Sequence, residues 1–110
     1  MKGRFIKAVY VPIDMHTRSN RCLPMVLYVV GRKLRPDAVD RNRIRRLMKE
    51  AYRHEKPAAR RCAQRLAGEK DRKLCIAFIF TGRGKKLPSP ERFRDEIRTL
   101  LTGIAASGYQ

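Results

Sequence analysis

Residues 37–53 read D-A-V-D-R-N-R-I-R-R-L-M-K-E-A-Y-R, a stretch in which apolar and basic side chains alternate. Apolar side chains recur three or four positions apart, which is the period of one face of an α-helix. They are Ile44, Leu47, Met48, Ala51 and Tyr52. Asp37 is a suitable N-cap, and Asp40 places negative charge in the first turn, where the helix dipole favours it. The stretch predicts an amphipathic helix packed on a core.

The rest of this helix is basic. At about 100° per residue, a polar face forms opposite the apolar stripe, and Arg41 falls near the apolar edge, where it can still project past the helix end. A guanidinium binds phosphate oxygens through parallel N–H bonds and stacks on bases, so a row of arginines suits a polyanion. The candidate RNA-binding residues are Arg41, Asn42, Arg43, Arg45, Arg46, Lys49 and Arg53.

The alternative is an ordinary solvated helix. Such helices usually place acids at i,i+4 to relieve repulsion between like charges. Here Asp40 and Glu50 are the only acids between Val39 and Arg53. A polyanionic partner would offset the cost of this crowding, so we favour the RNA-binding interpretation.

Composition points the same way. The 110 residues include 27 Lys and Arg against 10 Asp and Glu, a formal net charge of +17, which indicates a nucleic acid or an anionic surface as partner. The length predicts a single domain, residues 1–110. The longest apolar run, residues 23–30, is far shorter than the ~20 residues that span a bilayer, and the N-terminus lacks signal-peptide features. We therefore expect a cytoplasmic protein with no membrane partner.

The sequence predicts no catalytic residue and no metal site on the protein. The three cysteines are widely spaced, and His16 and His54 do not complete a zinc-ligand spacing. Carboxylates are scattered rather than clustered. Asp14 and His16 lie close together in sequence, but no nucleophile accompanies them.

Three extended segments and two further helical segments surround the basic helix. We expect strands over 4–13, ending near Pro12, and over 22–33, and a buried central strand over 74–80, the most apolar run. A helical piece over 58–67 should follow Pro57, which kinks or restarts the helix. The last helix should be capped by Ser89, with Pro90 at its first position. This order predicts an α/β (α+β) sandwich, a mixed β-sheet with helices on one face.

The basic helix also carries a resemblance. Ala38-Val39-Asp40-Arg41-Asn42-Arg43-Ile44-Arg45-Arg46, followed by Leu47, Glu50, Ala51 and Arg53, resembles the signature of the bacterial ribonuclease P protein component. That pattern runs A-V-x-R-N-R-x-[KR]-R, then a hydrophobic position and an [RK]-E-A-[FY]-R ending. The resemblance extends more loosely over residues 4–104. It implies a fold like the second domain of ribosomal protein S5, with a left-handed βαβ crossover through the basic helix.

The resemblance further implies a function. The family's basic helix contacts the catalytic ribonuclease P RNA, and the holoenzyme, an endoribonuclease, removes the 5′ leader of precursor tRNA. Its chemistry is carried by Mg²⁺ bound to the RNA, so no cofactor is expected on the protein, which should be monomeric within the ribonucleoprotein. The family's leader-binding cleft lies on the sheet face. The positions that match it best are Tyr10 on the first strand and Arg32 and Lys33 before the basic helix, although Tyr10 suits an ordinary half-buried strand tyrosine equally well. Apart from the resemblance, we expect an open sheet face with aromatic residues on which single-stranded bases could stack.

Two departures from the family pattern bear on leader binding. The family normally opens with a short helix carrying spaced aromatics, and we expect that helix to be missing here, because the first predicted strand starts almost at once. Where many relatives read S-V-S-K-[KR], this chain has Val29-Val30-Gly31-Arg32-Lys33, which keeps the basic pair and loses both hydroxyls.

Two other functions remain open. Composition and architecture suit a structural ribosomal-type protein that binds rRNA equally well, and only the signature separates the two. A nuclease acting alone is disfavoured, because the sequence has no clustered acids or paired histidines.

Overall fold

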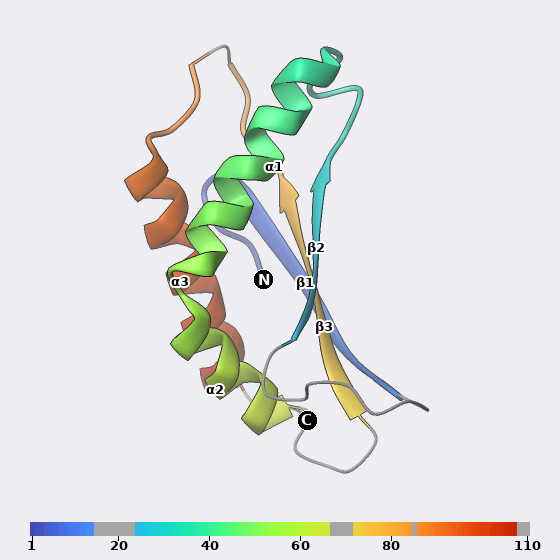
Figure 1. Ribbon diagram of the computed structural model, residues 1–110, viewed down its shortest axis with the longest axis vertical. Helices are drawn as coiled ribbons and strands as arrows, with labels where there is room; N and C mark the ends of the chain where they lie inside the picture. The colour runs from blue at the N-terminus through green and yellow to red at the C-terminus, as the bar shows by residue number, and fades with distance from the viewer. Residues whose placement is uncertain (15–23, 67–71, 85, 108–110) are drawn as a thin grey trace.

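Three helices cover one face of a three-stranded sheet in the computed structural model, which describes residues 1–14, 24–66, 72–84 and 86–107 (Figure 1). In chain order the elements are β1 (Ile6–Asp14), β2 (Met25–Val30), α1 (Ala38–Arg53), α2 (Lys56–Leu66), β3 (Arg72–Phe80) and α3 (Pro90–Ser107). The predicted mixed sheet with helices on one face is confirmed.

The sheet has the order β1-β3-β2, with β3 in the centre as predicted. β1 runs antiparallel to β3, with Tyr10 opposite Ile76, and β2 runs parallel to it, with Val26 opposite Ile76. The chain therefore crosses from β2 to its parallel neighbour β3 through α1 and α2. The left hand of this crossover and the likeness to ribosomal protein S5 stay predictions.

Two strand boundaries differ from the sequence-based expectation. β1 does not end near Pro12 but continues to Asp14, and Pro12 pairs with Leu74. Proline is tolerated there because β1 is an edge strand, which has a neighbour on one side only in this sheet. β2 is shorter than the expected extended segment, so Arg32 and Lys33 lie in the turn after it. The part of that segment before Pro24 lies outside the described residues.

The core lies between the sheet and the helices. From α1, Ile44 and Met48 are fully buried, and Ala51 and Tyr52 nearly so. Asp37 caps this helix as predicted, because its Oδ1 accepts a hydrogen bond of 2.9 Å from the amide of Val39. The predicted stripe of α3 is also buried, and Ser89 Oγ accepts from the amide of Arg92 at 3.3 Å. That stripe comprises Phe93, Ile97, Leu100, Leu101 and Ile104.

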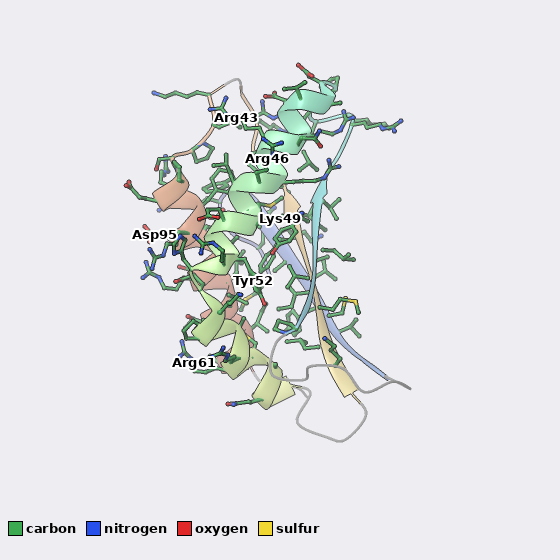
Figure 2. The ribbon with its side chains drawn as sticks, viewed as in Figure 1. Arg43, Arg46, Lys49, Tyr52, Arg61 and Asp95 are labelled. Atoms are coloured by element: carbon green, nitrogen blue, oxygen red, sulfur yellow. The ribbon has the colours of Figure 1, made fainter. Side chains whose placement is uncertain are left out.

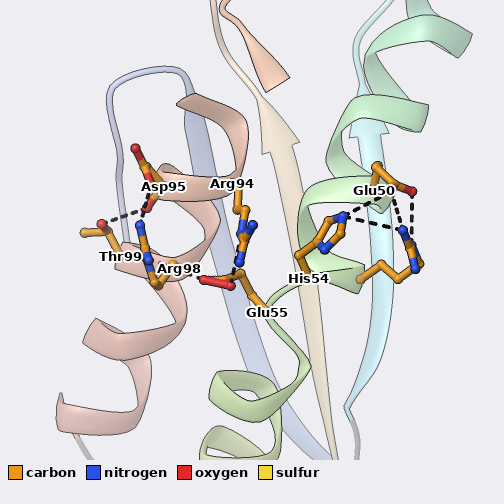
Figure 3. A network of polar contacts seen from close by, with 8 residues as sticks. Glu50, His54, Glu55, Arg94, Asp95, Arg98 and Thr99 are labelled. Carbon is orange, nitrogen blue, oxygen red and sulfur yellow. Dashed lines mark hydrogen bonds and ion pairs between the residues drawn. The ribbon is translucent and has the colours of Figure 1, made fainter. Parts of the chain in front are cut away.

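A buried carboxylate fixes the corner between α1 and α2. Glu55 is 7% exposed, and its oxygens lie 3.5 Å from Nε of Arg94 and 3.4 Å from Nε of Arg98, both on α3 (Figure 3). A buried carboxylate is costly unless it is paired, so these two ion pairs offset the cost of burying Glu55. The corner between α1 and α2 is thereby tied to α3.

Tyr52 of α1 is buried against the rings of Tyr28 and Phe78. Its hydroxyl has no hydrogen-bond partner among the described residues. Burial raises the pKa of Tyr52 from its ordinary 10.0 to about 12. Because burial disfavours the charged phenolate, the fold keeps its stability below pH 10 and loses part of it as the pH rises from 10 towards 12.

We predict that Tyr52→Phe raises the free energy of unfolding at pH 7 by about 1 kcal/mol, because it removes an unpaired buried hydroxyl and keeps the ring contacts. It should also reduce the loss of stability between pH 10 and 12, without abolishing it, since burial raises the pKa of Tyr28 and of the Cys62 thiol as well. Urea unfolding across this pH range measures both effects. A variant less stable than the wild type at pH 7 would show that the hydroxyl makes a hydrogen bond in the folded protein.

Candidate RNA interface

One face of α1 presents uncompensated positive charge. Arg43, Arg46 and Lys49 are exposed, and none of them has a hydrogen bond or ion pair with another described residue. They follow one another along the helix (Figure 2) and line a single hollow on its surface. Because Ile44 and Met48 on the opposite side are fully buried, the backbone that carries these cations is held in place.

Arg53 belongs to the same face but is neutralised by Glu50. Its Nη2 lies 2.6 Å from Glu50 Oε1, and its Nε donates to Oε2 at 3.2 Å (Figure 3). His54 Nε2 lies 3.2 Å from the same carboxylate. The hydrogen bond from Arg53 is the main reason that the pKa of Glu50 lies below its ordinary value. A phosphate would therefore have to compete with this internal ion pair to bind Arg53.

The remaining three predicted residues have internal partners. Arg45 is half-buried, and its Nη1 donates to Oδ1 of Asn42 at 3.1 Å. Arg41 is half-buried too, and its Nη1 donates to the carbonyl oxygens of Arg35 at 2.9 Å and Pro36 at 2.7 Å. It does project past the helix end, as expected, but towards the protein's own backbone. RNA contact by the seven residues stays a prediction, and the geometry favours Arg43, Arg46 and Lys49.

α2 is basic too, although no site residue was predicted on it. Lys56, Arg60 and Arg61 are exposed there, and Figure 2 shows Arg61 on α2, beyond the end of α1. The two-residue corner at 54–55 extends the positive surface of α1 onto the next helix. The signal in the sequence was the basic composition of residues 54–73, which does not reveal which side chains point outward.

The open face of the sheet is mainly aliphatic, with Lys7 on the same side as Val9 and Val11. Its large side chains are 40–52% exposed and comprise Val9, Val11, Met25, Leu27 and Val29. The expectation of stacking aromatics on this face is wrong for the described residues, because Tyr10 and Tyr28 point to the helix-covered side and pack against the core. Tyr10 has the strand parity of Ile6 and Ala8, which are fully buried, so an RNA strand on the open face would not reach its ring. Arg32 and Lys33 are exposed in the turn after β2.

Within the described ranges, no group of three or more His, Cys, Asp or Glu side chains could hold a metal ion. In the same part of the chain, no helix is long and apolar enough to cross a membrane.

Comparison with known proteins identifies the chain's relatives. The family model described as Ribonuclease P matches residues 2–104. A ribonuclease P protein component of Chlorobaculum tepidum is 42% identical over 107 residues, which cover 97% of this chain and 70% of the relative. One from Chlorobium phaeobacteroides is 36% identical over 107 residues, covering 96% of this chain and 73% of the relative. No solved structure matches.

We predict that Glu50→Gln strengthens RNA binding, because it releases Arg53 from its ion pair and removes a negative charge from the basic face. The dependence of log affinity on log salt should steepen by ~0.7–0.9, the value for one additional phosphate contact. Binding titrations at several salt concentrations measure this slope. Glu91→Gln, an exposed acid on α3, makes the same change in net charge and should leave the slope unaltered. Equal effects of the two variants would contradict a specific role for the basic face of α1.

Proposed function

The chain belongs to the ribonuclease P protein family, and we propose that it acts as the protein subunit of that ribonucleoprotein. In this role it binds the catalytic RNA and the 5′ leader of precursor tRNA, and it assists the endonucleolytic step that forms the mature tRNA 5′ end. We place this activity in the cytoplasm, with one copy of the chain in each complex.

The exposed cations of α1 are the observation that carries the proposal. Arg43, Arg46 and Lys49 lack partners among the described residues and project from a helix whose other face is buried. Cations held on a rigid element bind phosphates without first losing the freedom of a mobile segment. Such contacts fix the position of a protein on RNA and carry little sequence information, which suits a subunit that docks on a folded RNA.

The leader is assigned to the open face of the sheet and the turn beside it. Arg32 and Lys33 supply charge for its phosphates, and the aliphatic side chains of β1 and β2 supply a surface for its bases. An apolar surface of this kind contacts bases of any sequence, so we expect affinity for the leader with little sequence preference.

The proposal assigns no bond-making or bond-breaking step to the protein. Magnesium ions on the RNA subunit supply the chemistry of phosphodiester hydrolysis when they are bound, by activating water and stabilising the leaving oxygen. The residues of this chain hold the RNA subunit and the leader in a fixed relation to each other. Their contribution is to the affinity for substrate and to the amount of metal that the complex requires.

A structural ribosomal-type protein remains the second candidate, because a basic helix on a mixed sheet would suit rRNA as well. Family membership favours ribonuclease P. A nuclease that acts alone is the third candidate, and metal-dependent cleavage of RNA by the pure protein would support it over the proposal.

The deciding experiment is cleavage of precursor tRNA at low magnesium by a bacterial ribonuclease P RNA, with and without the protein. We expect the protein to increase the cleavage rate only when the RNA is present, because phosphate neutralisation replaces part of the metal requirement. Tight binding of the RNA without an increase in rate would support the ribosomal-type alternative.

We predict that Arg43→Glu combined with Arg46→Glu abolishes assembly with the RNA subunit and leaves the fold intact, because both side chains are exposed and without partners in the described residues. Filter binding and circular dichroism measure the two effects. The matched control reverses the charge of two other exposed cations, Lys2 in the N-terminal segment and Arg92 on α3. This control should retain most of the affinity. A collapsed circular dichroism spectrum of the α1 variant would mean that its arginines serve the fold.

A further inference from the structure

The turn between β2 and α1 is closed by its own backbone. The amide of Arg35 donates to the carbonyl of Gly31 at 3.0 Å, and the loop so formed carries Arg32 and Lys33. Both side chains are exposed and have no ion pair with any described residue. The turn is thus a small platform with two uncompensated positive charges.

The side chain of Arg35 points inward rather than to solvent. It is 7% exposed, and its Cζ lies 5.6 Å from the centre of the Phe80 ring at the end of β3. Its Nη1 lies 3.6 Å from Oδ2 of Asp40 in the first turn of α1. The base of the turn is therefore attached both to the central strand and to the helix.

Arg41 makes the second attachment. Its Nη1 bridges the carbonyl oxygens of Arg35 and Pro36, at 2.9 and 2.7 Å. A cation in the first turn of a helix is disfavoured by the helix dipole, so its place there requires a compensating contact. The two carbonyls supply that contact, and they belong to the segment that leads from the turn into the helix.

We propose that Arg41 is a positioning residue rather than a phosphate ligand. With Arg35 and Asp40 it clamps the turn to the start of α1, so that Arg32 and Lys33 stand in a fixed relation to the cations of the helix. This proposal rests on the proposed function and deepens it, because it divides the arginines of the basic signature into RNA ligands and residues that hold those ligands. An ordered turn binds its polyanion more tightly than a mobile one, since less conformational entropy is lost.

The clamp requires a guanidinium. A lysine at position 41 keeps the positive charge, but its ammonium reaches one bond less far and lacks the planar set of donors. Arg41→Lys therefore separates the two roles. A phosphate ligand would keep much of its contribution in this variant, whereas a clamp would be lost.

The test is a double-mutant cycle in full-length protein assembled with a bacterial ribonuclease P RNA. Two affinities are measured, that of the protein for the RNA and that of the complex for precursor tRNA with its leader. The proteins compared are the wild type, Arg41→Lys, Arg32→Gln/Lys33→Gln (the turn variant) and the triple variant. The Arg32→Gln/Lys33→Gln variant is expected to weaken one of these two affinities roughly tenfold, because two phosphate contacts are lost. Arg41→Lys should weaken the same affinity by a similar factor. The triple variant should bind no more weakly than the turn variant.

Arg43→Gln in the same background is the matched control. Arg43 shares no partner with the turn among the described residues. The factor by which Arg43→Gln weakens binding should therefore multiply with the factor for the turn variant. The proposal is overturned if Arg41→Lys binds within twofold of the wild type, or if its loss multiplies with that of the turn variant. It is overturned equally if removing Arg32 and Lys33 weakens neither affinity.

A readout without RNA keeps the clamp separate from the proposed function. In the free protein, hydrogen exchange at the amide of Arg35 should accelerate in Arg41→Lys, while amides in the buried centre of α1 keep their protection. If Arg41→Lys does not fold, Arg41→Gln, which keeps one amide donor, takes its place in the same cycle. Failure of the wild-type protein to bind ribonuclease P RNA would refute the proposed function, whereas normal binding with unchanged exchange at Arg35 would refute the clamp alone.

Discussion

The burial of the apolar stripe of α1 against the sheet is the contact on which the rest of the structure depends. Ile44 and Met48 are fully buried, and burial of such side chains contributes about 1.5–3 kcal/mol each. This contribution offsets the repulsion among the cations on the other side of the helix. It also fixes the direction in which those cations point, because a helix that buries one face must expose the opposite one. The exposed basic face of α1 is therefore a consequence of the core.

The arginines around α1 differ in role because their surroundings differ. Arg43 and Arg46 point to solvent without partners among the described residues, Arg53 is neutralised by Glu50, and Arg41 bonds to backbone carbonyls. One side-chain type can do all of this because the guanidinium is always charged and offers five donors in a plane. Where it is exposed it is free to bind phosphate, and at half-buried Arg41 it binds backbone carbonyls. The number of arginines in the basic helix therefore exceeds the number that are free to bind a phosphate.

The sequence was sufficient for the features that depend on local pattern. The stripe of α1, its Asp37 cap, the central position of β3 and the Ser89 cap all follow from residue spacing and propensity, and all are present in the structure. The sequence also predicts which residues of β1 share a face. It does not predict which face the helices cover, because Val9 and Val11 are as apolar as Ile6 and Ala8. The helices cover the face that carries Tyr10, so the open face of the described sheet lacks the expected aromatic side chains. The sequence pattern could not predict the hydrogen-bond partners of Arg41, because they are backbone carbonyls, which every residue has.

The few acidic side chains explain why the excess positive charge gathers where it does. In the described part of the chain, Asp40 pairs with Arg35, Glu55 with Arg94 and Arg98, and Asp95 with Arg98. Asp37 caps α1, and Glu96 accepts hydrogen bonds from the amides of Arg4 and Phe5. These acids thus stabilise caps, corners and attachments of the fold, and on the outward face of α1 Glu50 alone among the described acids offsets a cation. A chain with a net charge of +17 that uses its carboxylates in this way leaves part of its unpaired charge on the surface of the basic helix, where a phosphate backbone could compensate it.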